Sequence, residues 1–135
     1  MDLCHFPVLV VDDEQSVLSA LKRELKGIAP ILTALNADEA EKILYSQTVA
    51  VVISDYKMPK KDGVTFLSGL KDLNYEPVKI LLTAYSEIDI VVDAINKANI
   101  FYFLRKPWNS AELQMLVKRG LETFARAGEL KTCKQ

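Results

Sequence analysis

The chain has 135 residues, half of them hydrophobic, which suits one domain with a single core. Lys and Arg number 17 and Asp and Glu 18, and this charge is too balanced to predict attraction to nucleic acid or anionic membranes. The sequence has no basic signal segment and no apolar run near the roughly 18 residues of a membrane span, and Cys4 and Cys133 lack metal-ligand spacing. We therefore expect a cytoplasmic protein with free thiols.

The first predicted strand, Val8–Val11, is apolar without a polar alternation, as in strands covered on both faces. Asp12 and Asp13 follow it directly. Apolar residues then recur at helical spacing, and Gly27 marks the end of that helix. The repeat consists of Val17, Leu18, Leu21 and Leu25.

A second, more polar strand is predicted over Pro30–Ala34, and its polarity favours the edge of a sheet. Asn36, placed three residues before Glu39, predicts the start of a second helix. The apolar positions of that helix are Ala37, Ala40, Ile43 and Leu44. The third predicted strand, Val49–Ile53, is again apolar and leads to Asp55.

Two more apolar runs end in the same way: Ile80–Leu82 leads to Thr83, and Ile100–Leu104 leads to Lys106. A helix-start signal follows each run, namely Ser86 before Asp89 and Asn109 before Glu112. The last helix carries one apolar stripe, made of Leu113, Leu116, Val117, Leu121 and Phe124.

This alternation predicts a doubly wound α/β domain, a parallel sheet with helices on both faces. Parallel strands bring their carboxyl ends to one edge, so the polar residues after the strands would meet there. They are Asp12, Asp13, Asp55, Thr83 and Lys106. Each residue alone has an ordinary explanation as a turn, cap or surface residue. Their joint placement favours a site.

These residue types suit phosphoryl chemistry. Three carboxylates held close together raise one another's pKa unless a cation neutralises them, and their hard oxygens suit Mg²⁺. Because Mg²⁺ polarises phosphoryl oxygens, one carboxylate can attack phosphorus, and Asp55 is the candidate nucleophile. The Lys106 ammonium and the Thr83 hydroxyl can each hold a phosphoryl oxygen.

Four segments carry a resemblance to a known family over nearly the whole chain. They are Val10-Val11-Asp12-Asp13-Glu14, Asp55-Tyr56-Lys57-Met58-Pro59 with Asp62-Gly63, Leu82-Thr83-Ala84, and Lys106-Pro107. In this order they resemble the receiver domain of two-component response regulators. The resemblance implies the flavodoxin-like (βα)5 fold with strand order 2-1-3-4-5, a receiver over residues 1–128, and a tail or linker to an output domain over 129–135.

The resemblance also implies roles for individual residues. Asp55 is the phosphoacceptor. Mg²⁺, or Mn²⁺ in its place, is held by Asp13, Asp55 and the backbone carbonyl of Lys57, with Asp12 acting mostly through water. The phosphoryl oxygens contact Thr83, Lys106 and the amides of Tyr56 and Ala84. The Lys106–Pro107 peptide is expected to be cis.

The implied function is a regulatory switch rather than a turnover enzyme. A sensor histidine kinase or a histidine phosphotransfer protein phosphorylates Asp55, Thr83 moves inward, and Phe103 follows. The face of the fourth helix, fifth strand and fifth helix then acts on an output domain, an effector protein or a second copy. The resemblance implies no direct binding to nucleic acid or membrane. Tyr102 is expected to pack in the core on the face opposite Phe103.

Three other classes of protein share features with this sequence. A flavin-binding module would need a phosphate-cradling loop where the chain has Asp12-Asp13-Glu14, which repels phosphate. An aspartate-nucleophile phosphatase would need a second acid as general acid and a capping insertion, and neither is evident. A receiver-like interaction module that works without phosphorylation stays open, although the complete set of acids, hydroxyl and lysine argues against it.

Overall fold

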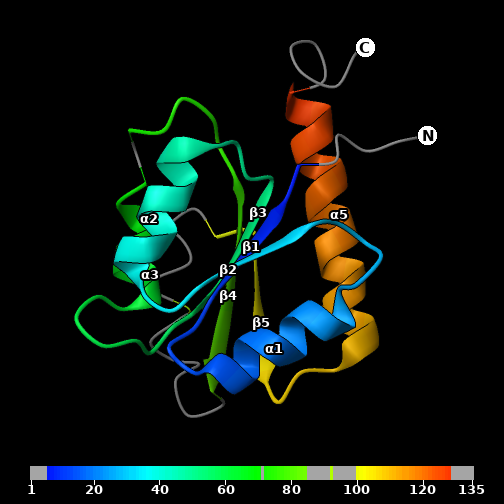
Figure 1. Ribbon diagram of the computed structural model, residues 1–135. Helices are drawn as coiled ribbons and strands as arrows, with labels where there is room; N and C mark the ends of the chain where they lie inside the picture. Colours follow the sequence, from blue (N-terminus) through cyan, green and yellow to red (C-terminus); the bar gives the residue numbers. More distant parts are fainter. Residues whose placement is uncertain (1–5, 71, 85–91, 93–99, 129–135) are drawn as a thin grey trace.

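The computed structural model describes residues 6–70, 72–84, 92 and 100–128 (Figure 1). Within them, five parallel strands form one sheet in the order β2-β1-β3-β4-β5, which confirms the predicted topology. The strands are β1 Val8–Val11, β2 Ile31–Ala34, β3 Val51–Asp55, β4 Val78–Ala84 and β5 Tyr102–Lys106. The helices are α1 Gln15–Glu24, α2 Ala37–Ser46, α3 Gly63–Ser68 and α5 Ser110–Gly128. The helix predicted between β4 and β5 lies outside the described residues.

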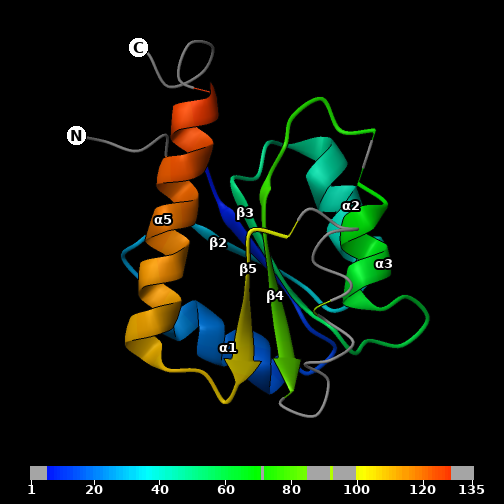
Figure 2. The same ribbon diagram turned by 180° about the vertical axis from the view of Figure 1, so that it is seen from behind.

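The helices cover both faces of the sheet. Helices α1 and α5 lie on one face and α2 and α3 on the other, as the two opposite views show (Figures 1 and 2). Alternate residues of each strand enter the two cores, so β1 contributes Val8 and Val10 to the first and Leu9 and Val11 to the second. The predicted stripe of α5, from Leu113 to Phe124, is buried in the first core.

Strands β3 and β5 end later than their apolar runs. Asp55 pairs with Leu82, and Lys106 pairs with Ala84, so both polar residues lie inside the ladder rather than after it. The backbone pairing continues because it depends on neighbouring main chains and not on side-chain polarity. The side chains of Asp55 and Lys106 are therefore attached to paired strand ends.

Helix boundaries follow local side-chain capping. The Asn36 carboxamide oxygen accepts the Glu39 amide at 2.8 Å, and the Asn109 oxygen accepts the Glu112 amide at 3.0 Å, as predicted. Gly27, in the turn that follows α1, has a φ of +88°, a backbone conformation that favours glycine. The predicted cap at Ser86 lies outside the described residues.

The expectation that Tyr102 packs in the core is wrong. Its side chain is 43% exposed, and its ring meets the ring of Phe101 edge to face at 5.8 Å. The reason is the place of β5 at the edge of the sheet, where one neighbour is missing. Phe103, on the other face, is half-buried against the second core.

Two further expectations can be compared with the structure. The Lys106–Pro107 peptide bond is cis, as predicted. Among the described residues, no helix is both long enough and apolar enough to cross a membrane.

Candidate functional site: an acidic cleft at the carboxyl edge of the sheet

The carboxyl edge of the sheet gathers the three predicted acids. Asp12 and Asp13 follow β1, and Asp55 ends β3, the strand that pairs with β1. One carboxylate oxygen from each residue lies within 4.8 Å of the others. Asp12 is fully buried and Asp55 is 7% exposed, whereas Asp13 is open to solvent. The cluster therefore has a buried base and an accessible rim.

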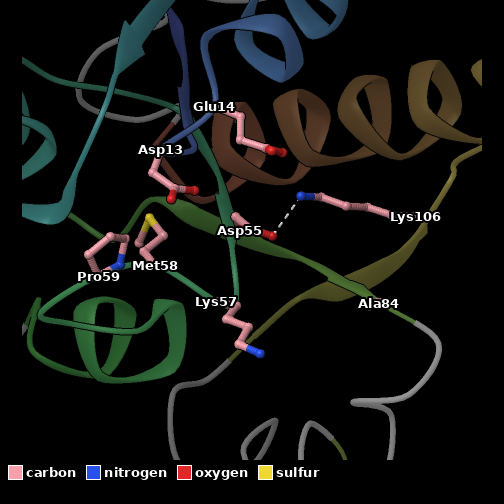
Figure 3. Close-up of a pocket in the computed structure, with 8 residues that line it drawn as sticks. All are labelled: Asp13, Glu14, Asp55, Lys57, Met58, Pro59, Ala84 and Lys106. Atoms are coloured by element: carbon pink, nitrogen blue, oxygen red, sulfur yellow. Dashed lines mark ion pairs between the residues drawn. The ribbon is translucent and has the colours of Figure 1, made fainter.

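Lys106 crosses from β5 to join this cluster. Its Nζ lies 2.9 Å from Oδ1 of Asp55 (Figure 3). The same Nζ lies 3.1 Å from Oδ2 of Asp12. The other Asp12 oxygen, Oδ1, accepts the backbone amide of Glu14 at 2.9 Å. Both oxygens of Asp12 thus have partners within the protein. The sequence predicts that Lys106 lies at this edge, but it does not predict that Lys106 pairs with both Asp12 and Asp55.

The site perturbs the protonation of its own groups. The pKa of Asp55 is raised from 3.8 to about 6, first by burial and then by the charges of Asp12 and Asp13, while Lys106 opposes the rise. Burial lowers the pKa of Lys106, but its bonds to Asp55 and Asp12 outweigh burial and raise that pKa overall. At neutral pH the pair is an ionised carboxylate beside an ammonium ion.

The first residue of α3 lies against the backbone of Asp55 at the end of β3. Gly63, the first residue of α3, donates its amide to the Tyr56 carbonyl at 2.7 Å. A β-carbon at Gly63 would collide with the backbone carbonyl oxygen of Asp55, so this position requires glycine. The side chain of Asp62 caps this helix by accepting the Thr65 amide at 2.7 Å. The Asp62-Gly63 motif therefore sets the distance between α3 and the end of β3.

The other predicted residues lie around the same edge. Thr83 is fully buried, and its hydroxyl donates to the Ala84 carbonyl at 3.2 Å. The Tyr56 amide donates to the Leu82 carbonyl at 2.8 Å. A phosphoryl oxygen that bound this amide would share its N–H group with the Leu82 carbonyl.

An open cleft of about 560 Å³ lies over the acids. Its lining residues are Asp13, Glu14, Asp55, Lys57, Met58, Pro59, Ala84 and Lys106 (Figure 3). Sequence reasoning assigned no role to Glu14, Met58 or Pro59, although each stands within four residues of a predicted acid. Their position in the chain was the available signal.

The donor set fits a divalent cation. Three carboxylates converge on one point, and Lys106 supplies one positive charge against three negative ones. Hard carboxylate oxygens with an accessible rim suit Mg²⁺, which keeps several of its own waters. Asp13 and Asp55 line the cleft from which an ion would enter, whereas the two oxygens of Asp12 already have protein partners.

This fold and cleft define a receiver domain. The family model described as the response regulator receiver domain matches residues 8–118. The chain belongs to this family.

Two named groups of proteins resemble the chain. It is 34% identical over 125 residues to the hydrogenase transcriptional regulatory protein HoxA of Bradyrhizobium diazoefficiens, covering 93% of this chain and 26% of that protein. It is 34% identical over 118 residues to the DNA-binding transcriptional regulator NtrC of Salmonella typhimurium, covering 87% of this chain and 25% of that protein. The chain thus spans about a quarter of the length of these curated relatives.

Solved structures agree with this assignment. The signal receiver domain of an HD domain-containing protein from Pseudomonas fluorescens superposes with a TM-score of 0.87 at 28% identity, covering 96% of both chains. A response regulator receiver domain protein from Clostridium thermocellum gives a TM-score of 0.77 at 29% identity, covering 93% of this chain and 98% of that one.

Proposed function

We propose that the chain is the phosphoacceptor of a two-component pathway and takes a phosphoryl group on Asp55. The donor is the phosphohistidine of a sensor histidine kinase or of a histidine phosphotransfer protein. The observation that carries this proposal is the Asp55 carboxylate, which faces an open cleft and has an ammonium ion 2.9 Å away.

The transfer step follows from these groups. One Asp55 oxygen attacks phosphorus, and an O–P bond forms as the P–N bond to the donor imidazole breaks. The imidazole leaves with the electron pair of that bond and takes a proton from solvent. Asp55 must be ionised to attack, and its pKa of about 6 leaves it mostly ionised at neutral pH.

Asp13, Asp55 and the Lys57 carbonyl would hold Mg²⁺ or Mn²⁺, and Asp12 would act mostly through water. When bound, the metal neutralises charge on the transferring phosphoryl group. Lys106 pairs with Asp55 before transfer and with a phosphoryl oxygen after it.

The phosphoryl group would then act as a switch. The Thr83 hydroxyl would leave the Ala84 carbonyl for a phosphoryl oxygen, with the Ala84 and Tyr56 amides as further donors. Phe103, half-buried beside this edge, would follow and alter the face that includes β5 and α5. Part of that face, the predicted fourth helix, lies outside the described residues.

The altered face would control an output domain, an effector protein or a second copy of the chain. An output domain is the favoured target because HoxA and NtrC are transcriptional regulators about four times as long as the matched part. We infer a regulatory role in the cytoplasm, with catalysis limited to the chain's own phosphorylation and dephosphorylation.

Intact-mass spectrometry after incubation with acetyl phosphate tests this function. We expect one added phosphoryl group that requires Mg²⁺, is released by hydroxylamine and is absent from Asp55→Asn. The exposed Asp72→Asn variant should be phosphorylated like the original protein. If neither acetyl phosphate nor a panel of phosphorylated histidine kinases gives an adduct, the chain is instead an interaction module that works without phosphorylation.

A further inference from the structure

Glu24, the last residue of α1, binds one group from the segment before α5 and two from the first turns of α5. Its Oε1 atom accepts hydrogen bonds from Nε1 of Trp108 and from Oγ of Ser110, both at 2.8 Å. Its backbone carbonyl accepts a bond from Nε2 of Gln114 at 2.9 Å. We call these four residues the Glu24 clamp. It joins two elements that are more than eighty residues apart in the sequence.

An acid at this position does not serve its own helix. The carboxyl end of a helix carries partial negative charge, so a glutamate there is unfavourable, and the neighbouring Lys22 and Arg23 are of the favourable sign. The half-buried Glu24 carboxylate instead makes two charge-assisted bonds across the α1–α5 contact. Glu24 therefore stabilises the contact between α1 and the start of α5 rather than α1 itself.

The clamp holds the segment that carries Lys106. Trp108 stands two residues after Lys106, and its ring packs against the core beneath α1 and α5. Lys106 binds Asp12, just before α1, while Trp108 and Ser110 bind Glu24 at the other end of that helix. The segment 106–110 is therefore tied to both ends of one helix.

We propose that Glu24 is a positioning residue that, through Trp108 and Ser110, holds the β5–α5 segment so that Lys106 meets Asp55. The proposal rests on the proposed function, because the pairing of Lys106 with Asp55 matters there for phosphotransfer. A small displacement of a group that contacts the reacting atoms slows a reaction considerably.

The variants are chosen to separate the clamp from general damage. Glu24→Ala removes the acceptor, whereas Glu24→Gln keeps a carbonyl oxygen at the same place. Glu122→Ala removes an exposed glutamate from α5 and serves as the matched control. Trp108 is the single tryptophan of the sequence, so fluorescence excited at a wavelength that tyrosine does not absorb reports on the surroundings of Trp108.

Lys106 is followed by reductive methylation and peptide mass spectrometry, with the exposed Lys42 of α2 as internal reference. In Glu24→Ala we expect a red-shifted Trp108 emission and a several-fold rise in Lys106 labelling relative to Lys42. Glu24→Gln and Glu122→Ala should stay close to the original protein. Unchanged Lys106 labelling in Glu24→Ala, with or without a fluorescence shift, would overturn the proposal.

Two additions keep the result decisive. If circular dichroism shows that Glu24→Ala does not fold, Trp108→Phe removes the indole donor while keeping an aromatic ring, and the same rise in Lys106 labelling is expected. The labelling reaction needs neither a phosphodonor nor a metal, so it tests the positioning of Lys106 independently of phosphorylation. If the original protein takes no phosphoryl group, that result overturns the proposed function alone. Where phosphorylation occurs, its rate with acetyl phosphate should fall several-fold in Glu24→Ala and recover in Glu24→Gln.

Discussion

The two ends of the sheet are built from the same strands but differ in their polar groups: charged side chains gather at one end and a neutral hydroxyl at the other. At the carboxyl end, Asp12 and Asp55 are buried together and share the Lys106 ammonium. At the amino end, the neutral Tyr75 hydroxyl accepts the Val49 amide at 3.3 Å and faces the carbonyls of Leu44 and Gln47 at 2.9 and 3.1 Å.

Aromatic packing reinforces the amino end. The ring of Phe124 meets those of Phe6 and Tyr75 edge to face, at 5.6 and 6.4 Å. Such pairs add to the free energy of burial. The amino end therefore stabilises the fold, whereas the carboxyl end keeps like charges close together. Four predictions test this division, in order of decreasing effect on stability.

The largest effect is expected at the amino end. Phe124→Ala should lower the free energy of unfolding by about 3–5 kcal/mol, because it removes a buried ring and leaves a cavity beside the partly buried rings of Phe6 and Tyr75. Urea unfolding measures the loss, and Phe124→Leu, which fills part of the space, should lose clearly less. Phosphorylation per folded molecule should be unchanged. A lower level of phosphorylation per folded molecule in Phe124→Ala would show that the two ends of the sheet are not independent.

At the carboxyl end, stability should depend on the ionisation of Asp55. Its pKa is about 6 in the folded chain against an ordinary 3.8, so the folded state binds this proton more tightly. In metal-free buffer, the stability of the original protein should fall as pH rises from about 4 to about 6 and then level off, losing about 3 kcal/mol from this group. Asp55→Asn should lack that decline.

Urea unfolding at several pH values, with a chelator present, measures this difference. Asp72→Asn, at an exposed position, should retain the decline of the original protein. Parallel pH profiles for the original protein and Asp55→Asn would mean that the Asp55 carboxyl is not held in the repulsive surroundings described here.

A smaller effect is expected for the Tyr75 hydroxyl. Tyr75→Phe keeps the ring but leaves the Val49 amide and two carbonyls without this partner, so the free energy of unfolding should fall by about 1–3 kcal/mol. Thermal unfolding of this variant can be compared with Tyr45→Phe, which alters a side chain that is 53% exposed. Equal stability of the two variants would show that the Tyr75 hydroxyl does not stabilise the contact between the end of α2 and the residues before β3.

The smallest effect is expected for Asp13→Asn. Asp13 is exposed and is the last of the charges that raise the pKa of Asp55, so its removal should stabilise the metal-free protein by less than about 1 kcal/mol. Calorimetric titration should at the same time show weaker Mg²⁺ binding. A clear loss of metal-free stability would contradict the crowding of carboxylates at this edge.

Most of the fold and much of the site could be predicted from local patterns. Unbroken apolar runs predicted strands covered on both faces, and parallel strands place the residues at their ends along one edge. That reasoning predicts that Asp12, Asp55 and Lys106 lie close together. It could not locate the strand ends, because the ladder continues through Asp55 and Lys106 regardless of their polarity.

The sequence by itself determined the order of strands and helices along the chain and the residue types at the carboxyl edge. Hydrophobic spacing and capping act over a few neighbouring residues, so local patterns reveal them. Only the tertiary structure decided that Tyr102 is exposed at an edge strand, that Lys106 binds two acids, and that Glu24 holds Trp108. These contacts join residues brought together by the packing of separate elements, and no local pattern in the chain encodes their distance or direction.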